Sequence, residues 1–276
     1  MTQTAVITGG TGGMGVATAK LLGRDHRIVL ADLSQERIDS VVNDLTALGI
    51  DASGTVCDIT DRASVDALFD FASAGDHHVR AVIHTAGISP QMGTAAQVAH
   101  INGTGTVTVA QAFLQRAGQG DVLVNVASAA GHSMPKALIP FRAFRLAESN
   151  PDKFEKIIVS RARVLGKKLH SGLAYAFSKS FMIWYTRWLA QAFGVKGARI
   201  VSISPGSFDT PMGRLEEDHG AGALLKVAAL KRFGKPEEIA AVLAFCASPA
   251  AGYLTGADIQ VDGGTAAGQE FKRSRS

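Results

Sequence analysis

A tyrosine and a lysine lie four positions apart in this sequence, at Tyr175 and Lys179. On a helix, this spacing puts the two side chains on one face, one turn apart. A phenol has an ordinary pKa of about 10 and is a poor acid or base at neutral pH. An ammonium about 4 Å away, at an effective dielectric constant of about 20, would favour the phenolate by roughly 4 kcal/mol. The pair could therefore pass a proton to and from a substrate oxygen.

The same spacing also occurs on amphipathic helices whose lysine simply lies along an apolar surface. A serine, Ser128, strengthens the chemical interpretation, because it follows an apolar run at residues 121–126 that is typical of a buried strand. A hydroxyl at the end of a strand can hydrogen-bond a substrate oxygen and stabilise the charge that develops on it. A turn serine would have the same local sequence, so the hypothesis depends on all three side chains together.

The elements that must position these groups begin at the N-terminus. An apolar run at residues 4–8, a glycine-rich stretch at 9–15 and a helical pattern at 16–22 predict a strand, a tight turn and a helix start. Backbone amides at such a helix start bind pyrophosphate. The next predicted strand, 27–31, ends in Asp32. A carboxylate there accepts hydrogen bonds from the ribose hydroxyls of NAD and repels the 2′-phosphate of NADP.

The absence of a cation near Asp32 also favours NAD over NADP. The glycine-rich stretch holds no Arg or Lys, and Leu33 follows the acid directly, so no neighbouring cation is evident that would recruit a 2′-phosphate. We therefore expect NAD as the cofactor.

Predicted helices and strands then alternate, at 34–48, 51–56, 61–74 and 79–83. This alternation predicts an α/β fold with a parallel sheet covered on both faces, which binds ligands at the carboxyl ends of its strands. Asp58 follows one of these strands. Two interpretations stay open for its carboxylate: it accepts a hydrogen bond from an adenine amine, or it caps the following helix.

Composition indicates an ordinary globular protein. With 276 residues, of which 46% are hydrophobic, the chain is expected to form a single domain over residues 1–276. Its two cysteines, Cys57 and Cys246, are far apart and predict no disulfide and no metal site, which favours the cytoplasm. We expect no leader segment, because the N-terminus has no charged stretch and no small-residue cleavage site. We expect no membrane span, because the apolar runs are too short and too interrupted.

Taken together, these motifs resemble those of the short-chain dehydrogenase/reductase family, in its compact single-domain form. The family motif Thr-Gly-x-x-x-Gly-x-Gly is matched at residues 8–15. The family motif Asn-Asn-Ala-Gly reads His84-Thr85-Ala86-Gly87 here, so both asparagines are replaced. We expect His84 to substitute structurally for the first asparagine and not to act as a base. The resemblance covers nearly the whole chain and implies a Rossmann-like, doubly wound parallel sheet of about seven strands.

The resemblance also implies roles for individual residues. Tyr175 would be the general acid/base, Lys179 would lower its pKa and hold the nicotinamide ribose, and Ser128 would polarise the substrate oxygen. Asn102, in a predicted helical stretch at 91–117, would support a proton relay through its main-chain oxygen. The implied cofactor-binding residues are Gly9, Gly13, Met14, Gly15, Asp32, Asp58, Ala86, Gly87, Tyr175, Lys179, Pro205, Gly206 and Thr210.

The chain departs from the family between the serine and the tyrosine, where relatives usually have a much shorter stretch. Residues 132–170 form an insertion. Asn150 and Pro151 are a favourable N-cap and first helical residue, and apolar residues then recur at helical spacing, so we expect a helical hairpin. Nine positive side chains stand against three negative ones. The positive residues are Lys136, Arg142, Arg145, Lys153, Lys156, Arg161, Arg163, Lys167 and Lys168.

Three interpretations of this basic insertion remain open: a solvated outer face of a lid, a contact with a partner subunit, or attraction of an acidic substrate such as a coenzyme A or carrier-bound acyl group. Because it begins and ends beside the catalytic residues, we expect it to serve as a lid or an interface. Nucleic-acid binding is not expected, since no known module accompanies the basic residues.

The predicted function is NAD-dependent interconversion of a secondary alcohol and a ketone, with a hydroxysteroid or a similar apolar small molecule as the candidate substrate by analogy. One alternative is an acyl-thioester hydroxyacyl dehydrogenase or ketoreductase. Another alternative is a catalytically silent NAD-binding regulator. Such a protein would be expected to lack Tyr175, Lys179 or Ser128, and this sequence contains all three. The helix around residues 175–193 is apolar on much of its circumference, so we expect a homodimer or homotetramer.

Overall fold

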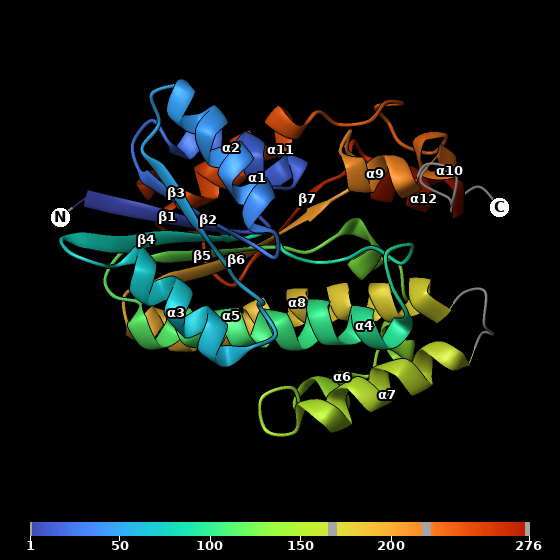
Figure 1. Ribbon diagram of the computed structural model, residues 1–276. Helices are drawn as coiled ribbons and strands as arrows, with labels where there is room; N and C mark the ends of the chain where they lie inside the picture. The colour runs from blue at the N-terminus through green and yellow to red at the C-terminus, as the bar shows by residue number, and fades with distance from the viewer. Residues whose placement is uncertain (1, 165–169, 217–221, 274–276) are drawn as a thin grey trace.

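The computed structural model describes residues 2–164, 170–216 and 222–273 of the chain. Seven parallel strands form one sheet in the order β3-β2-β1-β4-β5-β6-β7 (Figure 1). This order places β1 and β4 at the centre, so the chain reverses direction across the sheet between them. The predicted Rossmann-like, doubly wound sheet is confirmed. The strands are β1 (Thr2–Thr8), β2 (Arg27–Asp32), β3 (Ala52–Val56), β4 (His77–His84), β5 (Val122–Val126), β6 (Arg199–Pro205) and β7 (Asp258–Val261).

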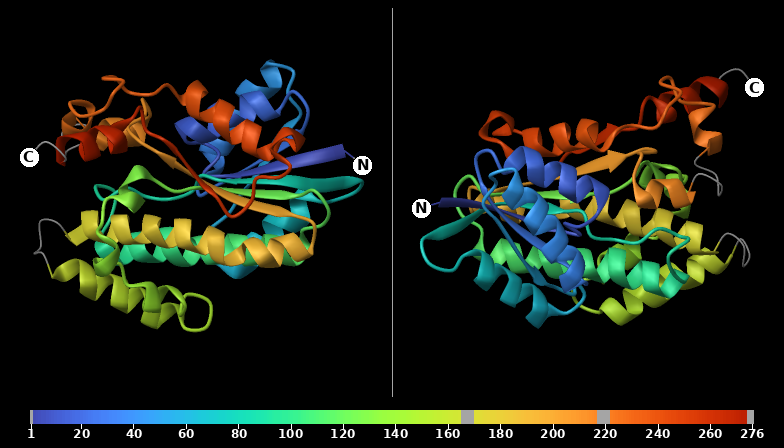
Figure 2. Two further views of the ribbon diagram at one scale, coloured as in Figure 1. Left: turned by 180° about the vertical axis from the view of Figure 1, so that it is seen from behind. Right: turned by 45° about the horizontal axis from the view of Figure 1, so that its top comes forward.

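Helices cover both faces of the sheet, as parallel pairing requires. One layer contains α1 (Gly13–Leu22), α2 (Gln35–Ala47) and α11 (Pro236–Ala247), and the opposite layer contains α3 (Arg62–Ala72), α4 (Ala95–Ala99), α5 (Gly105–Arg116) and α8 (His170–Val195) (Figures 1 and 2). Three shorter helices, α9 (Pro211–Glu216), α10 (Gly222–Leu225) and α12 (Thr265–Arg273), lie beyond the carboxyl end of β6 (Figure 1).

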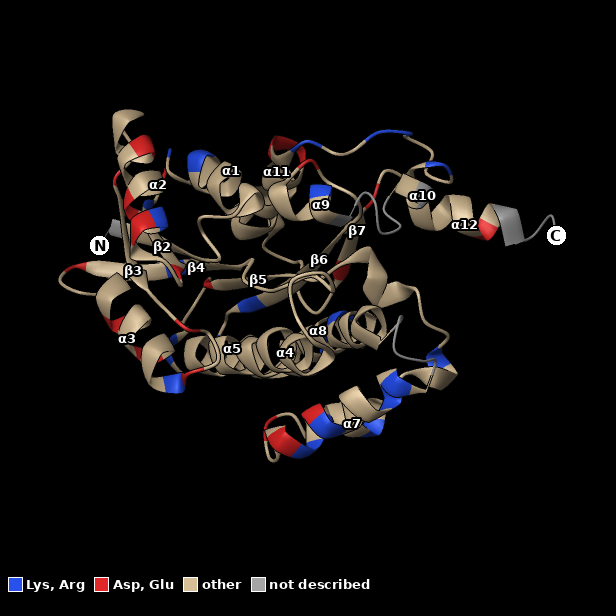
Figure 3. Cartoon of the chain, turned by 45° about the vertical axis from the view of Figure 1, so that its right-hand side comes forward, with Lys and Arg blue, Asp and Glu red and all other residues tan. Residues whose placement is uncertain are grey.

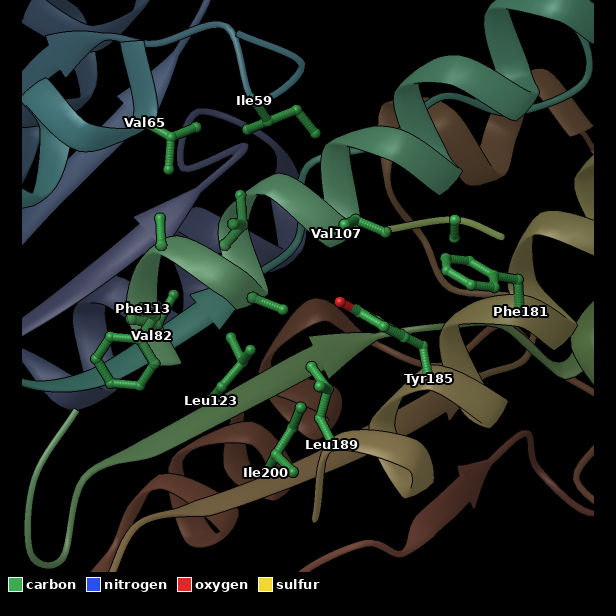
Figure 4. Close-up of a cluster of buried hydrophobic side chains, with 14 of the residues drawn as sticks. Ile59, Val65, Val82, Val107, Phe113, Leu123, Phe181, Tyr185, Leu189 and Ile200 are labelled. Carbon is green, nitrogen blue, oxygen red and sulfur yellow. The ribbon is translucent and has the colours of Figure 1, made fainter. Parts of the chain in front are cut away.

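The hydrophobic core is divided by the sheet into two clusters. Along β1, Val6 faces one cluster, whereas Ala5 and Ile7 face the other, because alternate strand residues point to opposite faces. On the α5 and α8 side, strand residues such as Leu123 meet helix residues such as Leu189 (Figure 4). Burial on both faces fixes the register of the strands, and with it the position of every group at their carboxyl ends.

The helical stretch predicted at 91–117 is not one continuous α-helix. It consists of α4, a five-residue π-helical turn and α5. We call the middle segment, η1 (His100–Thr104), the π-turn. A π-helical turn carries one extra residue relative to an α-helix and is frequent at functional sites. Here it contains Asn102.

The insertion is helical, as predicted. It contains α6 (Phe141–Phe144) and α7 (Pro151–Arg163), and Asn150 caps α7 by accepting a 3.0 Å hydrogen bond from the Lys153 amide. Both helices pack on the side of α4 and α8 that faces away from the sheet, as a third layer (Figures 1 and 2). Residues 165–169, at the predicted end of the insertion, lie outside the described part of the chain.

Aromatic side chains make this contact. Phe154 of α7 is fully buried, with its ring centroid 4.7 Å from that of Phe181 on α8. Phe144 of α6 is buried beside both, with centroids 6.5 Å and 5.3 Å away. Part of the apolar circumference of α8 is therefore covered by the chain's own insertion.

The charges of the insertion are sorted by face. Glu148 accepts a 2.8 Å hydrogen bond from the buried Tyr185 hydroxyl, and Glu155 contacts the π-turn, so two of its acids point inward. The Lys and Arg residues of α7 are all exposed, and Figure 3 shows in blue where they lie along the helix. Within residues 136–163, no Lys or Arg forms an ion pair with any described residue.

Self-association stays a prediction, but the insertion leaves a smaller part of α8 available for a contact between subunits. The ring of Trp184 stacks on that of Trp188, with 5.1 Å between the ring centroids. Trp188 lies beyond the area that the insertion covers, and its side chain is 53% exposed. A second subunit on α8 would therefore meet Trp188. None of the described helices is long and apolar enough to cross a bilayer.

Candidate active site

A cavity of about 720 Å³ opens at the carboxyl ends of the strands. It is lined by Ser128, Tyr175 and Lys179 and by all thirteen residues predicted to bind the cofactor. Asn102 does not line it and lies behind Gly87. The described part of the insertion contributes no lining residue, so residues 133–164 cover helices and not this cavity.

The glycine turn fits a pyrophosphate because side chains would fill the space it needs. Gly9 has φ +67°, and a Cβ atom there would lie 2.8 Å from the Ala86 backbone. A Cβ atom on Gly13 would lie 3.0 Å from the Thr210 methyl group. Helix α1 begins at this turn, and its N-cap, Gly12, offers no side-chain acceptor, which leaves the first amides of the helix available to an anion.

Asp32 stands at the end of β2 on the cavity wall. Its carboxylate accepts hydrogen bonds from the Thr11 amide (3.2 Å) and hydroxyl and from the Leu33 amide (2.8 Å). These contacts fix the orientation of the carboxylate on the cavity wall.

Sequence reasoning missed one lining residue with a bearing on the cofactor. Arg37 lies in the first turn of α2, after the Ser34 N-cap, and its guanidinium reaches to 3.5 Å from the Thr11 main-chain oxygen. Neither the glycine turn nor the residue after Asp32 supplies a cation, whereas Arg37 lies five residues beyond the acid. A basic residue in the first turn of the helix that follows β2 is the sequence feature that could have indicated this cation.

Asp58 lines the cavity with a carboxylate oxygen that accepts from the Thr60 amide (2.9 Å) and hydroxyl (2.7 Å). The helix cap is a different residue, Asp61, which accepts from the Ala63 amide at 3.0 Å. Of the two interpretations left open for Asp58, helix capping is therefore wrong, and the carboxylate lies at the cavity edge.

The predicted catalytic side chains of Ser128, Tyr175 and Lys179 line the same cavity because α8 contacts the end of β5. The Lys179 ammonium is buried, donates a 2.8 Å hydrogen bond to the Val126 main-chain oxygen and lies 5.8 Å from the centroid of the Tyr175 ring. The Ser128 hydroxyl oxygen, two residues beyond Val126, accepts from the Ala130 amide at 3.1 Å.

A second contact fixes the serine loop on α8. The Ser180 hydroxyl donates to the Gly131 main-chain oxygen, and a Cβ atom on Gly131 would lie 2.9 Å from the Lys179 backbone. The loop that carries the serine thus rests directly on the turn of α8 that carries the lysine.

Asn102 is fully buried and is not a surface residue of its helix. Its side chain closes a pair of 2.9 Å hydrogen bonds with Ile88, accepting from the amide and donating to the carbonyl oxygen. Its own main-chain oxygen accepts a 2.8 Å hydrogen bond from the Thr106 hydroxyl. The π-turn is therefore tied to the loop after β4.

His84 is a structural group, as expected. It is fully buried, and burial lowers its pKa to about 3, with the Lys179 charge adding to the effect, so the ring is neutral. Because the Thr106 hydroxyl donates to Asn102, its oxygen accepts from His84 Nε2 (3.3 Å), and Nδ1 then accepts from the Thr8 hydroxyl (2.7 Å). The ring joins β1, β4 and α5 where relatives carry an asparagine.

The rest of the wall is mostly apolar. Ile88 and Met92 after β4, Phe208 after β6 and Met212 and Leu215 on α9 all line the cavity. A largely apolar cavity with a few convergent polar groups is the usual form of a small-molecule site.

Comparison with known proteins agrees with this geometry. Residues 3–143 match the family model described as short chain dehydrogenase, and residues 156–266 match the model described as enoyl-(acyl carrier protein) reductase. The chain is 31% identical to the 3-alpha-hydroxysteroid dehydrogenase/carbonyl reductase of Comamonas testosteroni, over 94% of this chain and 95% of that protein. It is 26% identical to the 3-oxoacyl-(acyl-carrier-protein) reductase FabG of Thermotoga maritima, with 95% and 97% covered. A solved short-chain dehydrogenase from Burkholderia cenocepacia, in complex with NADP, superposes with a TM-score of 0.75 at 25% identity, with 95% and 97% covered.

Proposed function

Because this chain belongs to the short-chain dehydrogenase/reductase family, we propose that it is an NAD-dependent enzyme that interconverts a secondary alcohol and a ketone. One observation carries the proposal: the Tyr175, Lys179 and Ser128 side chains line the same cavity as the glycine turn and Asp32. The proton-transfer groups and the dinucleotide site thus share one space.

The bound nicotinamide supplies a hydride acceptor or donor at the substrate carbon. During oxidation, the Tyr175 oxygen takes the hydroxyl proton as the carbon loses its hydride, and during reduction the phenol returns that proton. The Lys179 ammonium favours the phenolate by its charge. The Ser128 hydroxyl donates a hydrogen bond to the substrate oxygen and stabilises the negative charge that develops there.

We propose that proton exchange with solvent passes from Tyr175 through Lys179 to a water molecule that the main-chain oxygen of Asn102 would hold. Because Gly87 has no side chain, the Asn102 side chain and the Lys179 ammonium both approach it closely. A Cβ atom on Gly87 would lie 2.9 Å from the Asn102 side-chain oxygen and 3.7 Å from the Lys179 nitrogen. A larger residue would therefore force the two groups apart.

The proposed preference for NAD rests on Asp32, whose charge opposes a 2′-phosphate. Arg37, which lines the same cavity and approaches the Thr11 main-chain oxygen, would favour NADP, and the solved relative is in complex with NADP. With the carboxylate held in place by Thr11 and Leu33, we expect repulsion to dominate in the wild-type protein.

The proposed substrate class follows from the lining. Apart from Ser128 and Tyr175, the residues after β4 and on α9 offer methyl and thioether groups, which suit an apolar alcohol or ketone such as a hydroxysteroid. The hydroxysteroid dehydrogenase relative supports this choice.

The experiment is a panel of secondary alcohols, including hydroxysteroids, assayed with NAD by the absorbance of the reduced nicotinamide. We expect turnover with at least one apolar substrate. Tight NAD binding without turnover on the whole panel would instead support the NAD-binding regulator.

A second candidate is a reductase or dehydrogenase of acyl thioesters. The enoyl-(acyl carrier protein) reductase model and the FabG relative favour it, as do the positive side chains of residues 136–163, which form no ion pair with a described residue. Those charges line no part of the cavity, so they would attract the carrier and not the reacting group. A KM for acyl-CoA or acyl-carrier substrate that rises with salt is the expected sign, and a KM indifferent to salt counts against this candidate.

A further inference from the structure

A single carboxylate of the insertion contacts both ends of the π-turn. Glu155 Oε1 lies 2.8 Å from His100 Nδ1 and also accepts a hydrogen bond from the Thr104 hydroxyl. His100 and Thr104 are the first and last residues of the turn. The carboxylate therefore fixes the distance between the two ends.

The centre of the turn is supported by the neighbouring residue of α7. Gly103 has no side chain, and a Cβ atom there would lie 2.7 Å from Cε1 of Phe154. The Phe154 ring cannot easily move away, because it is fully buried against Phe181. The turn thus contacts α7 at its first residue and at its last two.

This support matters because π-helical hydrogen bonding is rare and less favourable than α-helical bonding, so the turn depends on tertiary contacts. On the inner side, Ile88 holds the Asn102 side chain. On the outer side, the described contacts come from the insertion, at Phe154 and Glu155. Asn102 therefore lies between a contact from the loop after β4 and contacts from the insertion.

We propose that Phe154 and Glu155 are positioning residues, and that the insertion acts on the reaction from outside the cavity by holding the main-chain oxygen of Asn102 in the proton route from Lys179. This proposal rests on the proposed function. In this proposal, the insertion stabilises the conformation of the π-turn.

The test compares Glu155→Ala with three matched variants. Glu155→Gln keeps an acceptor oxygen for Thr104 and His100. Ile158→Ala removes a fully buried side chain one turn further along α7 that makes no hydrogen bond to the π-turn, and Lys156→Ala removes an exposed one. The measurements are kcat and KM with varied concentrations of imidazole buffer, and amide hydrogen exchange of a peptide spanning residues 100–106.

In Glu155→Ala we expect kcat to fall by about tenfold to a hundredfold, as small misplacements in active sites do, with KM for NAD unchanged. Part of the lost kcat should be recovered as the imidazole concentration increases, because imidazole can carry the proton that the disturbed route no longer transfers. Amide protection at residues 100–106 should fall. Glu155→Gln should recover most of the activity, and Lys156→Ala should match the wild type.

Unchanged kcat and unchanged amide protection in Glu155→Ala would overturn the proposal. So would an equal, imidazole-dependent loss in Ile158→Ala, because the effect would then be general loosening of α7. The exchange experiment needs no substrate. If the wild type turns over no substrate while Glu155→Ala still lowers amide protection at residues 100–106, the proposed function is wrong. The contact between Glu155 and the π-turn is then still supported.

Discussion

The Lys179 ammonium donates a 2.8 Å hydrogen bond to the main-chain oxygen of Val126, at the carboxyl end of β5. This bond ties the helix that carries Tyr175 to the strand that leads to Ser128. A buried ammonium requires such a partner, because an unpaired buried charge is costly. The contact therefore serves both stability and the geometry of the proposed catalytic group.

Replacement of Tyr175 by Phe should lower kcat by about a hundredfold to ten-thousandfold, the usual contribution of a general acid or base. NADH binding, measured by fluorescence titration, should stay near the wild-type value. Tyr253→Phe is the control, since that side chain is fully exposed. Full activity in Tyr175→Phe would remove the phenol from its role.

The cofactor preference can be tested at Asp32. The wild type should have a higher kcat/KM with NADH than with NADPH, and a preference for NADPH would contradict the proposal. In Asp32→Ser, kcat/KM with NADPH should rise by roughly tenfold to a hundredfold, since a hydrogen bond between charged groups contributes ~1.5–3 kcal/mol. The gain should disappear in Asp32→Ser/Arg37→Gln, because Arg37 is the lining cation that would bind the phosphate.

His84 should make the fold sensitive to acid. Its pKa is lowered by burial to about 3 in the folded protein, against about 6.5 when unfolded, so protons bind preferentially to the unfolded chain between these values. The stabilising contribution is complete above the unfolded pKa and is lost as pH falls through it, by up to ~1.4 kcal/mol per pH unit.

The comparison that isolates this contribution is His84→Asn, measured by urea unfolding at several pH values. Its free energy of unfolding should decline less steeply than that of the wild type as pH falls below about 6. Parallel curves for the two proteins would mean that the ring does not titrate as its burial implies.

Self-association should depend on Trp188. Light scattering of the wild type is expected to give a dimer or tetramer, and Trp188→Glu should shift it towards the monomer by placing a charge in the contact. Leu48→Glu, on an exposed residue at the end of α2, is the matched control. A monomeric wild type would refute the prediction.

Much of the site could be read from the sequence because its parts are local. A strand, a glycine turn and a helix occupy one continuous stretch, and Asp32 ends the next strand, so their arrangement follows from strand order alone. The spacing of Tyr175 and Lys179 likewise fixes a shared helix face.

The remaining features depend on tertiary packing. The apolar spacing of residues 91–117 is the same for a straight helix and for one that contains a π-turn, and contacts such as Phe154 on Gly103 distinguish them only in space. The amphipathic pattern of α7 shows that one face is buried but not against which surface. The position of Arg37 in the first turn of α2 can be read from the sequence, but its place on the cavity wall depends on how α2 packs against the sheet.

The outward face of α7 also offers a place for chemical attachment. Both native cysteines are buried, and burial raises the pKa of the Cys57 thiol to about 11 and that of the Cys246 thiol as well, so neither should react readily with maleimides. A cysteine installed by Lys156→Cys would then be the accessible thiol. A dye or a bead coupled there would sit on a surface that forms no wall of the cavity.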